Sequence, residues 1–383
     1  MIMNIDLLIT NKNKFEKLLE CGQSPWLDNI SRCMIDSGEL KSLVDNNIIA
    51  GITSNPSIFE KAIDSGKCNY PEIIKNMSSQ GLDTFKIYDA ITQKDIKDAA
   101  KILYPVYEKT EGNDGFVSIE VPPNIAMDTE TSVKEAERIF YSINEPNLLI
   151  KIPATKEGLS AITQIIAKGI NVNVTLMFSL THYINVADAY MEGLEIALKN
   201  GININKIHSV ASVFISRLDT MIDKLLDDIL NNNAGNADNK SRISSLKGMA
   251  AVANVKVIYN RFLEVLNSGR FKKLKSAGAN IQRPLWASTS TKNPDYYDLK
   301  YVEPLIAKNT VNTLPEQTIE SIADHGNIKS DTASYDFENS VNILNELKKL
   351  GIDTEQAGEI LQKEGVKSFE ESYNKLLDSI KNV

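Results

Sequence analysis

A lysine in the middle of an apolar run is the residue of this chain best placed to do chemistry. The run extends from Leu148 to Thr155, with Lys151 near its centre and Pro153 after it. Short apolar runs of this kind predict a strand buried on both faces of a parallel sheet. Poor solvation of an ammonium there favours the neutral amine, the nucleophile that forms Schiff bases with ketones and aldehydes. The structural alternative is that Lys151 reaches water at a strand end or pairs with a carboxylate.

Polar side chains recur at the ends of other strand-like runs. Each has a structural explanation when taken alone, because buried polar groups are usually satisfied internally. If the strands share one sheet, however, these groups meet in one pocket. A pocket that contains a lysine, an aspartate and a glutamate is suited to catalysis by an amine, with the carboxylates transferring protons. The residues are Asp28, Thr53, Asn55, Glu120, Asn173, Thr175, Ser212, Ser290 and Lys292.

Strand-like runs alternate with helical patterns along most of the chain, which predicts βα units around a parallel sheet. Eight such repeats favour a single (β/α)8 TIM barrel, whose active site lies at the carboxyl ends of the strands. No Gly-x-Gly-x-x-Gly or Walker-type loop follows any of them, which argues against nucleotide binding. The predicted strands are Ser24–Asp28, Ile48–Thr53, Phe116–Val121, Leu148–Ile152, Ile170–Leu176, Ser209–Phe214, Pro284–Ser288 and Asn309–Thr313.

The second half of the chain is mainly helical in pattern. Apolar residues at helical spacing predict a helix over Arg217–Leu230, then a polar loop over Asn231–Asn239 and a helical stretch over about Ser244–Asn267. After Asp331 two apolar faces follow, and no strand signal. We therefore expect one barrel domain over residues 1–383, with 331–383 as a helical extension packed on the barrel. The two faces are Phe337, Val341, Leu344 and Leu347, then Val366, Phe369, Tyr373, Leu376 and Ile380.

Composition narrows the class of protein. Of 383 residues, 42% are hydrophobic and 24% charged, which is ordinary for a globular protein. A net charge of -8 and the lack of a dense Lys/Arg stripe argue against nucleic-acid binding. No apolar run approaches the ~18–20 residues of a membrane span. Cys21, Cys33 and Cys68 are too few and scattered for a disulfide framework and suggest a reducing compartment, so we expect a cytoplasmic protein.

Histidine spacing gives no sign of a metal site. His182, His208 and His325 form no His-x-x-x-His or His-Glu-x-x-His pattern, so each is expected on the surface or in the core. Nothing in the sequence requires a carboxylate-bound magnesium ion. We expect neither a metal nor a cofactor.

Four motifs together resemble the transaldolase family in its longer bacterial form. Each lies on its own predicted strand, they follow the order of the family, and the resemblance covers nearly the whole chain. It implies an aldolase-type barrel and a metal-free Schiff-base mechanism. The motifs are Gly51–Phe59, Leu149–Thr155 with the Schiff-base lysine, Asn171–Ser179 and Ser212–Arg217.

The resemblance also implies a reaction. A dihydroxyacetone unit passes from sedoheptulose 7-phosphate to glyceraldehyde 3-phosphate, giving erythrose 4-phosphate and fructose 6-phosphate in the pentose phosphate pathway. Lys151 would form the imine, and Asp28 would take the proton of the C4 hydroxyl. Glu120 and Thr175 would hold a water molecule and move protons while the imine forms.

Substrate contacts are implied in the same way. Asn55 and Asn173 would bind the hydroxyls of the retained three-carbon unit, while Arg217, with Ser290 and Lys292, would bind the phosphate. At the position of Lys292, shorter members of the family have an arginine. A lysine can attract the phosphate by its charge, but it cannot donate the two parallel hydrogen bonds of an arginine. The remaining expected substrate-binding residues are Thr53, Ser212 and Phe214.

Two aspartates compete for the proton-transfer role. Asp36, in Ile35-Asp36-Ser37-Gly38, looks like the Asp-Thr-Gly motif of shorter members. Asp28 closes a predicted strand, which is where a barrel delivers a catalytic carboxylate. After Asp28 the pattern turns helical and places Asp36 in or just after a helix. We therefore assign the role to Asp28.

Two other functions stay open at this stage. An aldolase with the same lysine would release dihydroxyacetone instead of transferring it, and a catalytically dead barrel would only bind sugar phosphates. The C-terminal extension favours the transferase, and the presence of Lys151 with both carboxylates argues against the dead barrel. The expected partners are small-molecule sugar phosphates, with no nucleic acid and no membrane, and the chain is a monomer or a homodimer.

Overall fold

One curled parallel sheet forms the centre of the protein. The computed structural model describes residues 3–66, 68–233 and 236–383, and within them the sheet has seven strands in the order β1-β7-β6-β5-β4-β3-β2. Every residue of every strand is buried, as expected for parallel strands with both faces covered. The strands are β1 (Gln23–Leu27), β2 (Val117–Glu120), β3 (Leu148–Pro153), β4 (Val172–Met177), β5 (Ser209–Phe214), β6 (Gln282–Ala287) and β7 (Thr310–Leu314).

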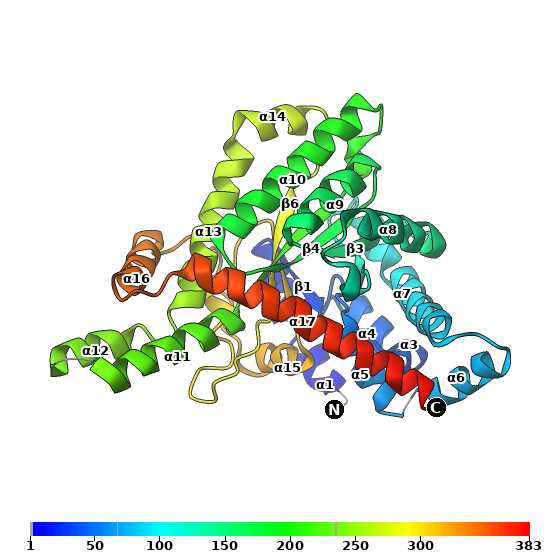
Figure 1. The fold of residues 1–383 in the computed structure, drawn as a ribbon, viewed down its shortest axis with the longest axis horizontal. Helices are drawn as coiled ribbons and strands as arrows, with labels where there is room; N and C mark the ends of the chain where they lie inside the picture. Colours follow the sequence, from blue (N-terminus) through cyan, green and yellow to red (C-terminus); the bar gives the residue numbers. More distant parts are fainter. Residues whose placement is uncertain (1–2, 67, 234–235) are drawn as a thin grey trace.

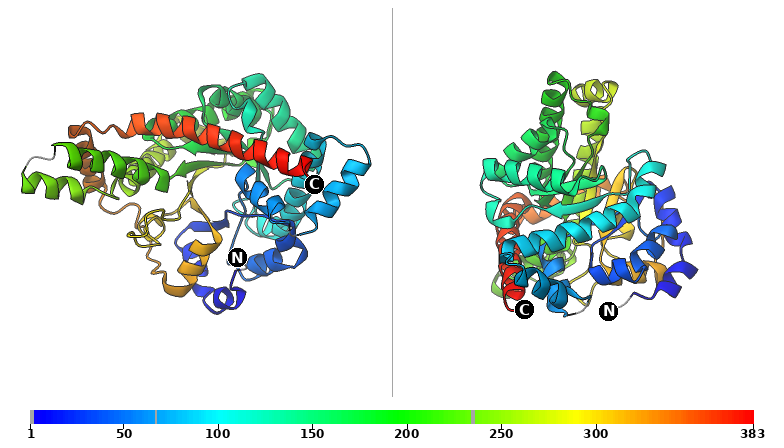
Figure 2. Two further views of the ribbon diagram at one scale, coloured as in Figure 1. Left: turned by 60° about the horizontal axis from the view of Figure 1, so that its bottom comes forward. Right: turned by 90° about the vertical axis from the view of Figure 1, so that its right-hand side faces the viewer.

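Helices surround the sheet (Figures 1 and 2). None of the helices in the described ranges is both long and apolar enough to cross a membrane. The helices are α1 (Ile5–Thr10), α2 (Asn13–Glu20), α3 (Arg32–Asp36), α4 (Glu39–Asp45), α5 (Pro56–Asp64), α6 (Tyr70–Ser79), α7 (Thr84–Lys109), α8 (Thr129–Ile143), α9 (Lys156–Ala167), α10 (Leu180–Lys199), α11 (Ser216–Asn233), α12 (Ala237–Ser245), α13 (Ala250–Asn267), α14 (Gly269–Ser276), α15 (Glu316–His325), α16 (Phe337–Lys349) and α17 (Thr354–Lys381).

The predicted strand Ile48–Thr53 is absent, so the described residues form seven strands where eight were predicted. Residues 50–53 run between β1 and β2, and only Ile52 makes bridges, one to Leu27 and one to Val117. Backbone hydrogen bonds still join this segment to both neighbours, from the N–H of Thr53 to the carbonyl of Leu27 (2.9 Å) and from the N–H of Ile52 to the carbonyl of Phe116 (2.8 Å). Gly51 lies so close to Trp26 that a Cβ atom would come within 2.5 Å of the indole ring. Asn55 then caps α5, which turns the chain out of the sheet.

The other seven strands and the helix over Arg217–Leu230 are confirmed, with ends shifted by a few residues at most. The polar loop predicted over Asn231–Asn239 is wrong in part, because α11 continues to Asn233 and α12 begins at Ala237. Residues 234–235 of that loop lie outside the described residues. The helical stretch over Ser244–Asn267 is interrupted between α12 and α13, where Gly248 has a left-handed φ of +69°.

The C-terminal helix α17 crosses the face of the molecule in front of the strands (Figure 1). It is anchored to the ends of β3 and β4 because the Gln362 side chain donates hydrogen bonds to the carbonyls of Ala154 (2.9 Å) and Leu176 (3.0 Å). Gly365 allows this approach, since a Cβ atom there would come within 2.9 Å of Leu176. Of the apolar face predicted here, Phe369, Tyr373, Leu376 and Ile380 are buried and Val366 is partly buried. Of the face predicted before it, on α16, only Leu347 is buried, and Phe337, Val341 and Leu344 are partly buried.

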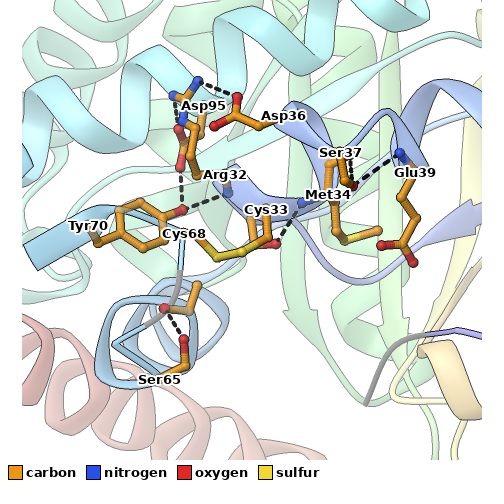
Figure 3. Close-up of a disulfide and its surroundings, with 12 residues drawn as sticks. Arg32, Cys33, Met34, Asp36, Ser37, Glu39, Ser65, Cys68, Tyr70 and Asp95 are labelled. Atoms are coloured by element: carbon orange, nitrogen blue, oxygen red, sulfur yellow. Dashed lines mark hydrogen bonds and ion pairs between the residues drawn. A yellow bond between two sulfur atoms is a disulfide. The ribbon is translucent and has the colours of Figure 1, made fainter.

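A disulfide joins Cys33 to Cys68, although the few, scattered cysteines were expected to form no disulfide framework (Figure 3). The two residues are 35 positions apart in the sequence, yet their Cα atoms lie only 4.8 Å apart. The folding of α3 beside the segment that follows α5 brings them together, and sequence spacing does not reveal this contact. Cys21 is a free, buried cysteine.

Candidate active site

A cavity of about 390 Å³ opens at the carboxyl ends of the strands. Ten of the twelve predicted site residues line it, all except Glu120 and Asn173, which are buried and contact lining residues. The predicted residues in the lining are Asp28, Thr53, Asn55, Lys151, Thr175, Ser212, Phe214, Arg217, Ser290 and Lys292. The topology explains this meeting, because parallel strands deliver their carboxyl ends to one side of the sheet.

Lys151 lies in the middle of β3 and is 4% exposed. Its Nζ donates a hydrogen bond to the carbonyl of Ser54 (2.8 Å) and lies 3.2 Å from Oε2 of Glu120. The ring of Phe369, from α17, lies with its centroid 5.9 Å from the same nitrogen. The ion pair of the structural alternative is therefore present. It lies in the wall of a cavity, however, where the amine can meet a substrate.

Glu120 and Thr175 present unpartnered oxygens beside this lysine. Oε2 of Glu120 pairs with Lys151, whereas its Oε1 and the Oγ1 of Thr175 have no hydrogen-bond partner among the described residues, although both are buried. Burial raises the pKa of Glu120 above its ordinary value, and the charge of Lys151 opposes this rise. Thr175 lies where the β4–β5 register shifts, and the next residue, Leu176, has a left-handed φ of 60°. Such irregularities in a strand commonly redirect a side chain at an active site.

Asp28 follows the last residue of β1 and faces the cavity. Thr53 donates a hydrogen bond to its Oδ1 (2.8 Å), and the Thr53 hydroxyl lies 2.5 Å from that of Thr313. Burial raises the pKa of Asp28, while Lys151 and the hydrogen bond from Thr53 lower it. Asp36, the competing aspartate, lies in α3 with 57% of its side chain exposed and does not line the cavity.

Two asparagines were expected to bind substrate, and their surroundings differ. Asn55 caps α5, where its Oδ1 accepts a hydrogen bond from the backbone N–H of Ile58 (3.1 Å). Asn55 is also one of the residues that line the cavity. Asn173 donates to the hydroxyl of Ser118 (3.0 Å) and accepts from that of Ser212 (2.7 Å). Asn173 therefore orients Ser212, which lines the cavity.

Cations gather at one end of the cavity. Arg217, in the first turn of α11, has a pKa lowered by burial, an effect that Glu364 opposes. Lys292 donates a hydrogen bond to Ser290 (2.8 Å), and its pKa is lowered by burial and by the nearby charges of Arg217 and Lys61. Cations that repel one another at a cavity wall create a site for an anion.

Several lining residues were not found by sequence reasoning. Lys61 is one of them. Its position could have indicated a role, because it lies one helical turn after Ile58 on α5, just beyond the motif that ends at Phe59. Thr313 lies on a strand that was predicted, but nothing in its pattern marked it. Phe369 reaches the cavity from the C-terminal helix, which only tertiary packing reveals.

The histidines lie away from this cavity. His182 pairs with Glu359 (3.0 Å), and the exposed His325 pairs with Asp298 and Asp324. Burial lowers the pKa of His208 to about 4, and this side chain lines a different cavity. Across the described part of the chain, no group of three or more His, Cys, Asp and Glu side chains could hold a metal ion.

Comparison with known proteins agrees with this arrangement. Residues 25–380 match the model of the transaldolase/fructose-6-phosphate aldolase family. A transaldolase of Trichodesmium erythraeum is 46% identical over 370 residues, 96% of this chain and 97% of that protein. A transaldolase of Parafrankia sp. is 45% identical (95% of this chain, 96% of that protein), and one of Mycobacterium tuberculosis H37Rv is 44% identical (94% of each).

Proposed function

Because the chain belongs to the transaldolase/fructose-6-phosphate aldolase family and is a transaldolase, we propose that it works through a Schiff base on Lys151. The proposed donor is sedoheptulose 7-phosphate and the acceptor glyceraldehyde 3-phosphate, in the pentose phosphate pathway. The observation that carries the proposal is the buried amine of Lys151 in the wall of a cavity, with Glu120 beside it and Asp28 in the same lining. We also propose that the enzyme works in the cytoplasm.

Imine formation requires Lys151 to lose a proton before it attacks the C2 ketone. Glu120 can accept this proton, because its Oε2 lies 3.2 Å from Nζ and burial favours the protonated form of its carboxyl group. Proton transfer between the two groups gives a neutral amine beside a neutral acid, which suits a poorly solvated site. A water molecule bound by the unpartnered oxygens of Glu120 and Thr175 would then carry protons during carbinolamine formation and dehydration.

Cleavage of the C3–C4 bond requires removal of the proton of the C4 hydroxyl. Asp28 is positioned for this role by Thr53, and its raised pKa makes it a better base when it is ionised. The electrons move toward the protonated imine, and the aldose phosphate leaves. Asn55 and Ser212, oriented by Asn173, would bind the hydroxyls of the three-carbon unit that stays on Lys151.

The architecture supports transfer over release of the three-carbon unit. Phe369 is 4% exposed, and its ring lies over Lys151, so α17 limits the access of water to the enamine. We propose that the fold works as a (β/α)8 barrel in which residues 50–53 take the place of the second strand. In this view the helical extension 331–383 belongs to the same domain, because it supplies Phe369.

A coupled assay tests the function directly. With sedoheptulose 7-phosphate and glyceraldehyde 3-phosphate, we expect fructose 6-phosphate and erythrose 4-phosphate in equal amounts. With fructose 6-phosphate alone, free dihydroxyacetone should form far more slowly. Release of dihydroxyacetone at the rate of transfer would contradict the proposal and favour the aldolase.

Removal of cations from the anion site should weaken the binding of phosphorylated substrates. We expect Arg217→Ala to raise KM for ketose phosphates roughly 10- to 150-fold, the worth of a charge-assisted contact of ~1.5–3 kcal/mol. Lys61 is exposed, so Lys61→Ala should raise KM only about two- to fivefold. Unphosphorylated ketoses should show little change. Lys75→Ala, at an exposed position of α6 outside the cavity, is the control. Equal losses on both substrate types would make Arg217 a structural residue.

Chelation should not affect the enzyme, because every proposed step uses an amine, carboxylates and hydroxyls. We expect full activity after dialysis against EDTA, measured in the coupled assay with metal-free reagents. Strong inhibition that added divalent metal reverses would show that the mechanism needs an ion.

A further inference from the structure

The Cys33–Cys68 disulfide joins α3 to the segment that follows α5, near the catalytic cavity (Figure 3). Cys33 lies in α3, which follows the loop after Asp28. Cys68 lies just beyond the end of α5, the helix that begins after Asn55 and carries Lys61. The bond therefore connects the segment of the proposed base to the segment of a phosphate-binding cation.

Both cysteines line a second cavity, of about 910 Å³, beside the catalytic one. The two cavities share four lining residues: Asp28, Ile58, Lys61 and Pro315. Cys33 and Cys68 are both half-buried, whereas Cys21 is buried. A reagent that enters this open cavity can therefore reach the disulfide next to the substrate.

The two sides of the disulfide are held differently. On the Cys33 side, Arg32 forms an ion pair with Asp98 (2.7 Å) and another with Asp95. These contacts keep α3 in place without the disulfide. On the Cys68 side, Cys68 and Asn69 both adopt left-handed backbone conformations, with φ of 68° and 57°. This conformation is uncommon for a residue with a Cβ atom such as Cys68. Tyr70, two residues further on, is held by hydrogen bonds with Arg32 (2.9 Å) and Asp95 (2.6 Å), so the part that should relax when the bond is cut is the segment between the end of α5 and Tyr70.

We propose that Cys33 and Cys68 form a thiol–disulfide exchange site that adjusts binding of the phosphate end of the substrate. The partner is a dithiol reductant. One of its thiolates attacks one sulfur of the disulfide, and the other cysteine leaves as a thiolate and takes up a proton. Attack by the second thiol of the reductant frees the first cysteine, so the reductant is oxidised to a disulfide as two electrons pass to the enzyme.

The proposed location and the contacts of α5 favour a switching role over a purely structural one. Disulfides in cytosolic proteins are usually transient and redox-sensing, and the proposed location is the cytoplasm. The first turn of α5 is fixed by the hydrogen bond between Ser57 and Ser372 (2.7 Å), whereas the disulfide lies just beyond its last turn, where Lys61 is. Reduction should therefore loosen Lys61 while leaving Asn55 and Lys151 in place.

The effect on activity rests on the proposed function. We expect reduction to raise KM for ketose phosphates about two- to fivefold, with kcat nearly unchanged. This is the change expected when the contact of one exposed charge with the phosphate is lost. KM for an unphosphorylated ketose should stay the same in both states. This division between KM and kcat separates the role of Lys61 from a general loss of folded enzyme.

The test compares the full chain after oxidation with diamide and after reduction with dithiothreitol. Alkylation of denatured samples, read by mass spectrometry, should find one free thiol, that of Cys21, in the oxidised protein and three in the reduced protein. Hydrogen exchange over residues 57–66 should be faster after reduction, and this readout needs no turnover. KM is then measured for both states.

Matched variants make the outcome decisive. Cys33→Ser with Cys68→Ser should show the KM and exchange rate of the reduced state under both treatments, while Cys21→Ser should keep the difference. Three free thiols after oxidation, or equal exchange and KM in both states, would overturn the proposal. Lack of turnover in both states would instead refute the proposed function, because thiol counts and hydrogen exchange do not depend on catalysis.

Discussion

Replacing Lys151 by arginine should lower kcat/KM by several orders of magnitude. A guanidinium keeps the positive charge beside Glu120, but it cannot form an imine with a ketone. Steady-state kinetics with sedoheptulose 7-phosphate and glyceraldehyde 3-phosphate measure the loss. Thermal unfolding of the variant, followed in parallel, establishes that the loss is chemical.

A matched control is Lys156→Arg, at an exposed position in the first turn of the helix that follows β3. This variant should retain wild-type kinetics. Activity of Lys151→Arg within tenfold of wild type would mean that another amine forms the imine. Lys61 and Lys292 are the other lysines of the described residues that line the catalytic cavity, so they would be examined next.

Replacing Asp28 by asparagine should separate imine formation from bond cleavage. The amide keeps the shape and the contact with Thr53 but cannot take the proton of the C4 hydroxyl. We expect turnover to fall by ~10²–10⁴, the usual worth of a general base. Because Lys151 and Glu120 are intact, borohydride should still trap the imine with fructose 6-phosphate.

Asp36→Asn is the control for this prediction. Asp36 is exposed on α3 and forms an ion pair with Arg32 at 3.9 Å. Ion pairs at the surface contribute little to the free energy of unfolding. The variant should keep wild-type turnover. If Asp36→Asn traps the imine without turning over, and Asp28→Asn stays active, the proton-transfer role belongs to Asp36.

Much of the site could be predicted because the strands of a parallel sheet all end at the same edge, so residues at successive strand ends lie close together. Lys151 stood out as a charge inside an apolar run, and Asp28 as a carboxylate at the end of one. Once the strands share one sheet, their carboxyl ends must meet. Local pattern also separated Asp28 from Asp36, because the helical spacing after Asp28 predicted that Asp36 would lie on a helix, as it does.

The rest depends on contacts between segments distant in the sequence. The pattern of Ile48–Thr53 is that of a strand, yet Asn55 caps α5 only two residues later, and Ile52 alone forms bridges. The spacing of the apolar residues around Phe369 predicted one face of a helix. Nothing in the local sequence indicated that this face would pack against Lys151. Cys33 and Cys68 pair because helices fold together, which spacing alone cannot predict.

Borohydride trapping with peptide mass mapping tests the central claim most directly. The protein is reduced with borohydride in the presence of fructose 6-phosphate, digested and mapped. We predict loss of activity and a three-carbon adduct on Lys151 alone, with no adduct in the sample without ketose. An adduct on a different lysine, or inactivation without any adduct, would contradict the Schiff-base account.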